Sequence, residues 1–150
     1  MTIHYTLYLA TNATPDEATL ALRDVVEKSA EDSPLEDAAP GTAWLPDGPV
    51  TITAWPLDYM PGIAEENGVD AKLGVDFQLL VEEVLEAKPI MLRDALYLLE
   101  KIPGDAVVHD VSDTVVLRRL RGKLELNTSC PFWTPELRAV VRAPHEARRF

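Results

Sequence analysis

Residues 72–81 read KLGVDFQLLV, and this run decides the fold because apolar and polar side chains alternate along almost all of it. Alternation with a period of two is typical of a β-strand that buries one face and leaves the other polar. A strand of this kind belongs to a sheet that is covered on one side. Leu80 breaks the alternation and marks where the strand leaves the sheet. The apolar face carries Leu73, Val75, Phe77, Leu79 and Val81, and the polar face carries Lys72, Gly74, Asp76 and Gln78.

Other segments show the same strand pattern on both sides of this run. IHYTLYLA at 3–10 sets Leu7 and its alternate neighbours on one face, and VTITAW at 50–55 does the same with Ile52. A short strand is expected at Trp44, inside the proline-rich segment 31–49. After residue 105, the sequence predicts strands near 106–110, 114–119 and 123–127, the last two joined by a hairpin turn at Arg121-Gly122.

Two main helices are predicted between these strands. The first begins at TPDE, residues 14–17, where Thr14 can cap the helix, Pro15 fits its first position and Glu17 completes a capping box. Its buried stripe is expected to be Ala18, Leu22, Val25 and Ser29, with an end before Ser33-Pro34. Pro89 is expected to separate the acidic EEVLEAK from the second helix, IMLRDALYLLEKI at 90–102. A short last helix is predicted at Thr134-Pro135-Glu136.

Grouped strands with short connections favour an α+β fold over a doubly wound parallel sheet. We therefore expect one domain over residues 1–150, with an antiparallel or mixed sheet of about six strands, two main helices packed on one face and a short C-terminal helix. If the helices cover the face of Leu7, Ile52, Val75 and Phe77, the opposite face stays polar and aromatic. That face would carry His4, Thr6, Tyr8, Thr51, Thr53, Trp55, Lys72, Asp76 and Gln78.

The charge of the chain favours some partners and excludes others. The formal net charge is −11; residues 1–100 hold 5 Lys and Arg against 19 Asp and Glu, and residues 101–150 hold 9 against 6. Such a surface repels nucleic acid and anionic lipid and attracts a basic partner. No leader peptide and no apolar run of about 18 residues is found, so the expected location is the cytoplasm, with no membrane contact.

The sequence contains no recognisable catalytic or cofactor site. Neither GxxxxGKS/T, GxGxxG nor GxSxG occurs, and one cysteine with three scattered histidines, His4, His109 and His145, falls short of a zinc set. Cys130 reads as a packed side chain. His109 and Asp110 should point to opposite faces of a strand, so the segment up to Asp113 reads as a turn. We predict no catalytic residue, no metal and no cofactor.

The basic stretch LRRLRGKLELNTSCPFWTPELR, residues 117–138, is the one candidate for nucleic-acid binding, since arginines and aromatic side chains lie close together in it. Alternation sends Arg118 and Arg119 to opposite faces, and the net charge opposes binding. We therefore interpret the stretch as scaffold: a hairpin whose leucines join the core, with Phe132 and Trp133 packing the last helix on the sheet.

Segments at both ends of the chain resemble one known family. The segment MLRDALYLLEKIPGDAVVHDVSDTVVLRRLRGKLELN, followed by FWTPELRAVVRAPHE, and the opening IHYTLYLAT are similar to the Sit-type (swarming inhibition) toxin immunity proteins of myxobacteria and their actinobacterial relatives. The resemblance implies a cytoplasmic protein without enzymatic activity that neutralises a toxin delivered by kin cells. It supplies no contact residues.

The leading hypothesis is therefore a non-enzymatic immunity protein that binds a cognate, basic protein toxin through an acidic surface. The sequence leaves monomer and homodimer open. A small-molecule-binding or enzymatic domain that uses the open sheet face near His4 and His109 is the alternative, and an interaction module without a toxin is a third. The expected protein-binding residues combine aromatic anchors with acidic groups: Trp44, Trp55, Asp58, Tyr59, Glu65, Glu66, Asp70 and Asp76.

Overall fold

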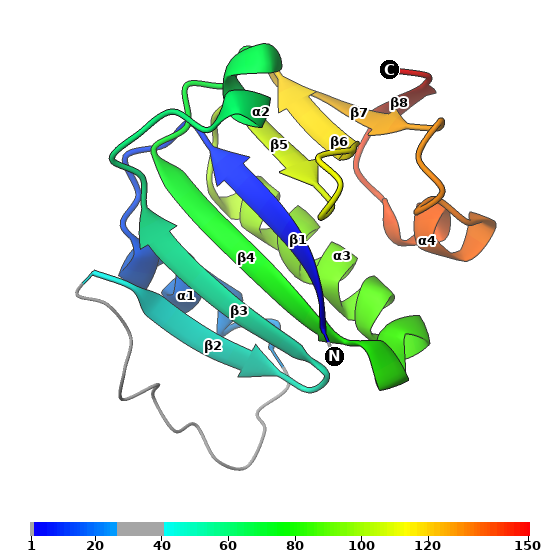
Figure 1. The fold of residues 1–150 in the computed structure, drawn as a ribbon, viewed down its shortest axis with the longest axis horizontal. Helices are drawn as coiled ribbons and strands as arrows, with labels where there is room; N and C mark the ends of the chain where they lie inside the picture. Colours follow the sequence, from blue (N-terminus) through cyan, green and yellow to red (C-terminus); the bar gives the residue numbers. More distant parts are fainter. Residues whose placement is uncertain (1, 27–40) are drawn as a thin grey trace.

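The computed structural model of the chain describes residues 2–26 and 41–150, which form one eight-stranded sheet with helices against it (Figure 1). The strand order is β2-β3-β4-β1-β5-β6-β7-β8, and all neighbours are antiparallel except β7 and β8. The α+β class and the mixed sheet are confirmed. The strands are β1 (Thr2–Leu9), β2 (Ala43–Asp47), β3 (Val50–Pro56), β4 (Leu73–Leu80), β5 (Ala106–His109), β6 (Val115–Leu120), β7 (Lys123–Asn127) and β8 (His145–Arg148).

The expectation of about six strands is wrong in number, because the described residues contain eight. The expected strand at Trp44 is present as β2, and β8 was missed. β8 reads HEAR and is mostly exposed, so it has no apolar alternation that could mark it as a strand. Its backbone pairing with β7, from Leu124 opposite His145 to Asn127 opposite Arg148, defines it instead.

The alternating run 72–81 contains β4, an interior strand of the sheet. It pairs with β1 over its whole length, from Leu73 opposite Leu9 to Leu80 opposite Thr2, and with β3 on its other side. Its four alternate apolar side chains, Leu73 to Leu79, are fully buried. Leu80 is 43% exposed and ends the strand, as its break in the alternation indicated.

Helix α1 (Pro15–Leu22) begins where the capping box predicted. The Thr14 hydroxyl accepts from the Glu17 N–H at 3.1 Å, and the Glu17 carboxylate accepts from the Thr14 N–H at 3.2 Å. Ala18 and Leu22 are buried against the sheet, as expected. The predicted end before Ser33-Pro34 is wrong: α1 ends at Leu22, and Val25, expected in the buried stripe, follows the helix in a turn. Ser29 and most of the proline-rich segment lie outside the described residues.

Helix α3 (Val84–Lys101) is longer than predicted, because Pro89 lies inside it and does not separate it from the acidic segment. The apolar stripe continues across the proline: Ala87 before it and Met91 after it are both buried. This packing holds the first turns in helical form although Pro89 cannot donate a backbone hydrogen bond.

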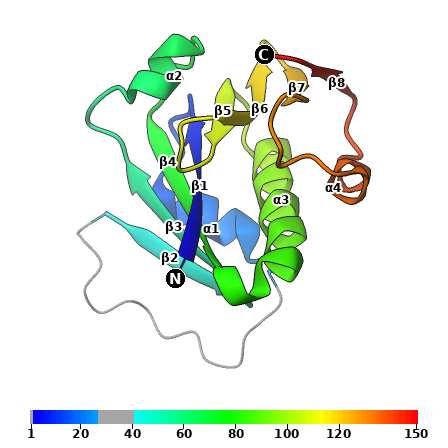
Figure 2. The same cartoon turned by 45° about the vertical axis from the view of Figure 1, so that its right-hand side comes forward.

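The two main helices, α1 and α3, pack on one face of the sheet and share its larger core, as predicted (Figure 2). The short helix α4 (Pro135–Val140) adds Leu137 to this core and lies beside α3. The arrangement differs in one respect. Residues read as turns after β3 contain a short helix, α2 (Gly62–Glu66), which joins a second, smaller apolar cluster on the opposite face.

Candidate functional site

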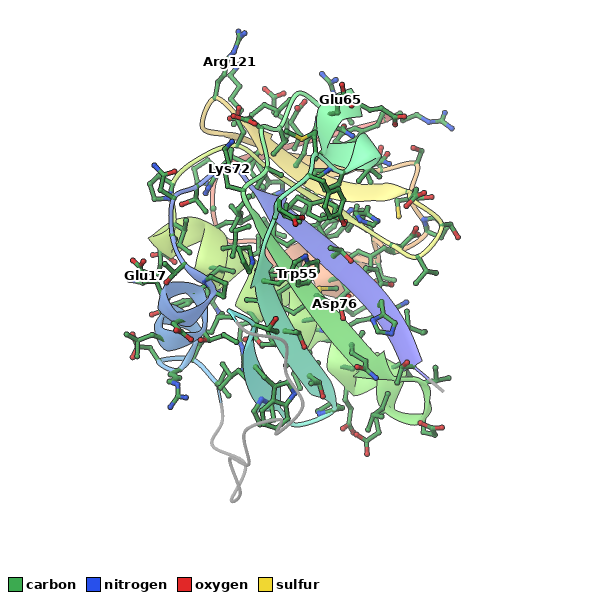
Figure 3. The ribbon with its side chains drawn as sticks, turned by 60° about the vertical axis from the view of Figure 1, so that its left-hand side comes forward. Glu17, Trp55, Glu65, Lys72, Asp76 and Arg121 are labelled. Carbon is green, nitrogen blue, oxygen red and sulfur yellow. The ribbon has the colours of Figure 1, made fainter. Side chains whose placement is uncertain are left out.

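The sheet face opposite α1 and α3, here called the open face, carries the polar and aromatic side chains expected from the alternation. Trp44, Thr53, Asp76 and Thr6 lie on it because the residues between them in each strand face the helices. Figure 3 looks toward this side and shows Trp55 and Asp76 over the central strands. The side chains of Trp44, Thr53, Asp76 and Thr6 are all partly buried.

Strand register aligns five of these residues across the sheet. Trp44 pairs with Thr53, Thr53 with Asp76, Asp76 with Thr6, and Thr6 with His109. We call this line the acceptor row. Neighbouring strands lie about 4.8 Å apart, so the row crosses five strands over roughly 19 Å.

Asp76 lies at the centre of the acceptor row and is held by two neighbours. The His4 Nδ1 lies 2.9 Å from one carboxylate oxygen, and the Thr6 hydroxyl donates to the other at 3.4 Å. An Nδ1–H that donates to Asp76 leaves the His4 Nε2 to accept, and the Thr2 hydroxyl lies 3.3 Å from it. The Asp76 side chain is 21% exposed, so this oriented carboxylate still reaches the surface.

His109 ends the row on β5 and is buried. Its ring stacks on Tyr8 with centroids 5.4 Å apart, and its Nδ1 lies 2.7 Å from the backbone oxygen of Asp110. The carboxylate of Asp113 is 3.7 Å from the same nitrogen. The His109 Nε2 and the Trp44 Nε1 are buried without a hydrogen-bond partner among residues 2–26 and 41–150.

The predicted turn after His109 is confirmed. The Asp110 carboxylate accepts from the backbone N–H groups of Ser112 and Thr114 at 2.8 and 3.0 Å, and Asp113 has a positive φ of 59°. The turn brings the Asp113 carboxylate to 3.7 Å from the His109 Nδ1. Strand alternation alone did not predict this contact.

One end of the open face is covered by α2 and its flanking loops. Ala64, Val69 and Ala71 pack on Tyr8 and Val107 of the sheet. This packing fixes the loop residues that carry most of the expected binding groups. In Figure 3, Glu65 of α2 lies near the top of the view, whereas Trp55 and Asp76 lie near its middle.

The structure separates the expected binding residues into two groups. Trp44, Trp55 and Asp76 lie on the strands of the open face and are partly buried. The others follow β3 or lie in and after α2, at the covered end, and are exposed: Asp58, Tyr59, Glu65, Glu66 and Asp70. Of this second group, Asp70 pairs with Lys72 at 3.7 Å.

Two carboxylates act on the Tyr8 hydroxyl at the open face. Burial raises the pKa of Tyr8, and the neighbouring groups Tyr59, Asp113 and Asp76 raise it further. Carboxylates from β4 and from the turn after β5 therefore act on the same hydroxyl, from opposite sides of β1. A cation placed between them would be stabilised by both.

Sequence reasoning missed a buried cluster on the helix side. Arg93 donates to Asp47 at 2.6 Å and to Asp94 at 3.1 Å, and both carboxylates are almost fully buried. Burial and the neighbouring Asp47 raise the pKa of Asp94 to about 8, although Arg93 opposes the shift. These residues fix the β2–β3 hairpin to α3, and the two carboxylates face the protein interior, so we assign the cluster to stability.

The basic stretch 117–138 is built into the scaffold. Arg118 binds Glu125 at 3.1 Å and Asn67 at 3.0 Å on the open side, whereas Arg119 binds backbone carbonyls at the end of α3. The turn Arg121-Gly122 joins β6 and β7 as predicted, with φ of 51° and 78°. Phe132 is buried in the core.

A groove of about 1160 Å³ lies between α3 and α4, away from the open face. Its lining is mainly apolar, and its charged side chains are Arg93, Glu100, Arg119, Glu136 and Arg142.

Cys130 lies elsewhere, in the core. Burial raises the pKa of its thiol, which keeps the thiol protonated at neutral pH. In the part of the chain that the structure describes, no three His, Cys, Asp or Glu side chains gather as a metal site. None of the described helices has the length and apolar character needed to cross a bilayer.

Comparison with protein-family models gives a match. A family model described as SitI3-like matches residues 3–137, which include the whole acceptor row, α2 and the start of α4. The match ends before β8, the strand that sequence periodicity did not predict. No curated protein and no solved structure matches the chain.

Proposed function

This chain belongs to the SitI3-like family of Sit-type immunity proteins, and we propose that it binds and neutralises a cognate protein toxin without catalysing a reaction. The observation that carries the proposal is the open face with its covered end. Carboxylates and aromatic side chains from β2, β3, β4 and the α2 segment lie there on one side of the molecule.

Charge supports a basic partner. The formal net charge of −11 attracts cations at long range, and Asp58, Glu65 and Glu66 are exposed at the covered end with no ion pair to another described residue. Exposed charges of this kind raise the association rate, while partly buried aromatic side chains such as Trp44 and Trp55 supply affinity. The same potential disfavours nucleic acid and anionic membranes as partners.

The side chains that could react also support a binding role. Cys130 is buried with a raised pKa, and the wide groove between α3 and α4 has no histidine or cysteine in its lining. We place the protein in the cytoplasm of the protected cell, where it would meet the toxin after delivery.

The test is direct binding of the purified chain to the toxin encoded beside its gene, measured by biolayer interferometry. We expect binding whose association rate falls at least several-fold between 20 and 150 mM salt, because steering by exposed charge is screened. The double variant Glu65→Gln/Glu66→Gln should slow association, whereas Glu86→Gln, an exposed carboxylate at the start of α3, should not. Absence of binding by the native chain would contradict the proposed function.

A second candidate function rests on the alignment of Thr2, His4 and Asp76. A hydroxyl, an imidazole and a carboxylate joined in this order resemble the parts of a nucleophilic site. Thr2→Val, which removes the hydroxyl and leaves His4 on Asp76, separates the two functions. A catalyst should lose turnover, whereas a toxin-binding protein should still protect cells that produce the toxin.

A further inference from the structure

Strand β8 forms one edge of the sheet, and no other described strand pairs with its outer side. Its residues Glu146, Ala147 and Arg148 are exposed. An edge of this kind presents backbone donors and acceptors that can pair with a strand of another chain. The opposite edge, β2, contains Pro46, which has no backbone N–H to donate. β8 contains no proline and is therefore the edge at which a further strand can be added.

The pairing of β8 with β7 shows which residues direct their backbone groups to the outer side. The Thr128 N–H donates to the Arg148 backbone oxygen at 2.8 Å, so the backbone groups of Arg148 point to β7. A strand residue directs its N–H and C=O to one side, and the side alternates from each residue to the next. Those of Glu146 therefore also point to β7, whereas His145 and Ala147 present theirs at the outer edge.

The side chains of Glu146 and Arg148 share one face of β8 because the two residues are two positions apart. Glu146 lies opposite Glu125, a like charge, and forms no ion pair with another described residue. The Glu125 carboxylate already binds Arg118 at 3.1 Å and the Arg148 Nε at 2.9 Å, so two guanidinium groups share one carboxylate. A second arginine near Glu146 and a second carboxylate near Arg148 would balance both charges.

Arg148 is held in place before any such contact forms. Its Nε binds Glu125, and its guanidinium lies 5.7 Å from the centroid of the Phe150 ring. The side chain is still 53% exposed, so its remaining N–H groups can reach a carboxylate outside the molecule. An ordered side chain loses less conformational entropy when it binds.

These observations select one register for a second copy of β8 paired antiparallel with the first. Outward-facing residues must lie opposite outward-facing residues, so the two-fold axis passes through a residue and not between two. An axis at Glu146 or Arg148 would place that side chain opposite its own copy, as like charges at a Cα spacing of about 4.5 Å. An axis at His145 would pair most of β8 with residues outside the strand. An axis at Ala147 places each Glu146 opposite an Arg148.

We propose that the chain forms a two-fold homodimer in which β8 pairs with β8 of a second copy around Ala147. The two Ala147 residues exchange backbone hydrogen bonds, and each Glu146 forms an ion pair with Arg148 of the second copy. The two eight-stranded sheets become one continuous sheet. Both open faces lie on the same side of the dimer, because residues opposite each other in a strand pair share a face.

The first test is sedimentation equilibrium of the full chain from low to high micromolar concentration at physiological ionic strength. We expect the mass to rise from one chain to two. Glu146→Arg places arginines at both ion-pair positions, and Arg148→Glu places carboxylates at both. Each variant alone should dimerise about tenfold or more weakly than the native chain, because two attractive pairs become repulsive.

The second test mixes the two variants, one of them ¹⁵N-labelled, and identifies the mixed dimer by native mass spectrometry. In the proposed register every substituted or native arginine then lies opposite a glutamate, so the mixture should dimerise about as tightly as the native chain. This recovery requires position 146 of one copy to meet position 148 of the other. A change in the stability of either variant alone would not produce it.

Glu86→Arg is the matched control, because it reverses an exposed charge at the start of α3, and it should dimerise like the native chain. Circular dichroism reports whether each variant is folded. A native chain that stays monomeric, folded single variants that dimerise like the native chain, or a mixture that stays monomeric would each overturn the proposal.

The dimer does not rest on the proposed function, and the two can fail separately. A monomeric Glu146→Arg variant that still binds the toxin would leave both proposals standing. A native chain that is monomeric and loses toxin binding with Glu146→Arg would assign the β8 edge to the toxin and overturn the dimer.

Discussion

The indole ring of Trp55 lies directly on Gly74 of the neighbouring strand. A Cβ added to Gly74 would lie 2.7 Å from two atoms of the six-membered ring, closer than real Cβ atoms approach. The two residues are paired across β3 and β4, so the missing side chain on one strand makes room for the large side chain on the other. This contact sets the height of the indole above the open face.

Gly74→Ala should therefore displace the indole of Trp55 and lower the free energy of unfolding by about 1–3 kcal/mol, the usual cost of overpacking a tight site. Urea unfolding followed by tryptophan fluorescence measures both effects. Gly62→Ala is the control, because a Cβ there meets no atom within 4 Å. In the Trp55→Ala background the cost of Gly74→Ala should disappear; a cost that persists would show that the indole is not what occupies the space.

The second prediction concerns pH and the cluster of Asp47, Arg93 and Asp94. The pKa of Asp94 is raised from 3.8 to about 8 in the folded chain, so between these values the folded state holds a proton that the unfolded state has lost. Because the unfolded state binds fewer protons in this range, the stability contribution of Asp94 is complete below about pH 4 and decreases as the pH rises toward 8.

Asp94→Asn removes the ionisation and keeps an oxygen that can accept from Arg93. The variant should match the native chain at pH 4.5 and exceed it at pH 8, by an amount on the order of a few kcal/mol. Chemical unfolding at the two pH values measures the difference. A variant that is equally or less stable than the native chain at pH 8 would show that Asp94 is not held protonated in the folded state.

The sequence predicted the strands and helices that have a periodic pattern of apolar residues. It missed the features that depend on one particular contact. Alternation located β1, β3 and β4, and therefore the face on which Asp76 would lie. β8 has no periodic pattern, and Pro89 lies in a helix because Ala87 and Met91 are buried on both sides of it.

The candidate site was predicted in part for the same reason. Alternation placed Trp55 and Asp76 on the open face, and the acidic residues of the segment after β3 indicated a surface for a basic partner. The unpaired Nε2 of His109 follows from the hydrogen bond of its Nδ1 to Asp110, where the register between β5 and β6 shifts at Val108 and His109, and no spacing in the sequence reports this. The buried pair of Asp47 and Asp94 joins residues far apart in the chain, and the charge of each alone predicted exposure.

The third prediction concerns Arg119, whose guanidinium closes the C-terminal end of α3. It donates to the carbonyl oxygens of Ile102 at 2.7 Å and Gly104 at 2.8 Å, and also to that of Leu99. Three acceptors at different positions suit the planar guanidinium better than one ammonium group. Arg119→Lys should therefore cost about 1–3 kcal/mol in unfolding free energy although the charge is kept.

Arg121→Lys, two residues further on, is the matched control because that side chain is exposed, and it should change stability by less than about 0.5 kcal/mol. Thermal unfolding of both variants gives the comparison. Equal melting temperatures for the two would mean that charge alone, and not the geometry of the three hydrogen bonds, stabilises the end of α3.

The fourth prediction separates scaffold from binding in the basic stretch. The Trp133 ring packs edge-to-face on Phe132 with centroids 5.0 Å apart, and its Nε1 donates to the backbone oxygen of Val116 at 2.8 Å. Phe132 in turn contacts Tyr5 of β1 at a centroid distance of 5.4 Å. This chain of contacts holds the segment before α4 on the helix side of the sheet, on the face opposite the acceptor row.

Trp133→Ala should consequently lower the unfolding free energy by about 2–4 kcal/mol through lost burial and a lost hydrogen bond, and the melting temperature by roughly 5–15 °C. Below its melting temperature, the variant should bind the toxin with native affinity, because the open face does not depend on this side chain. Calorimetry and interferometry on the same sample test both statements. An unchanged melting temperature together with lost binding would move the docking surface from the open face to the C-terminal half of the chain.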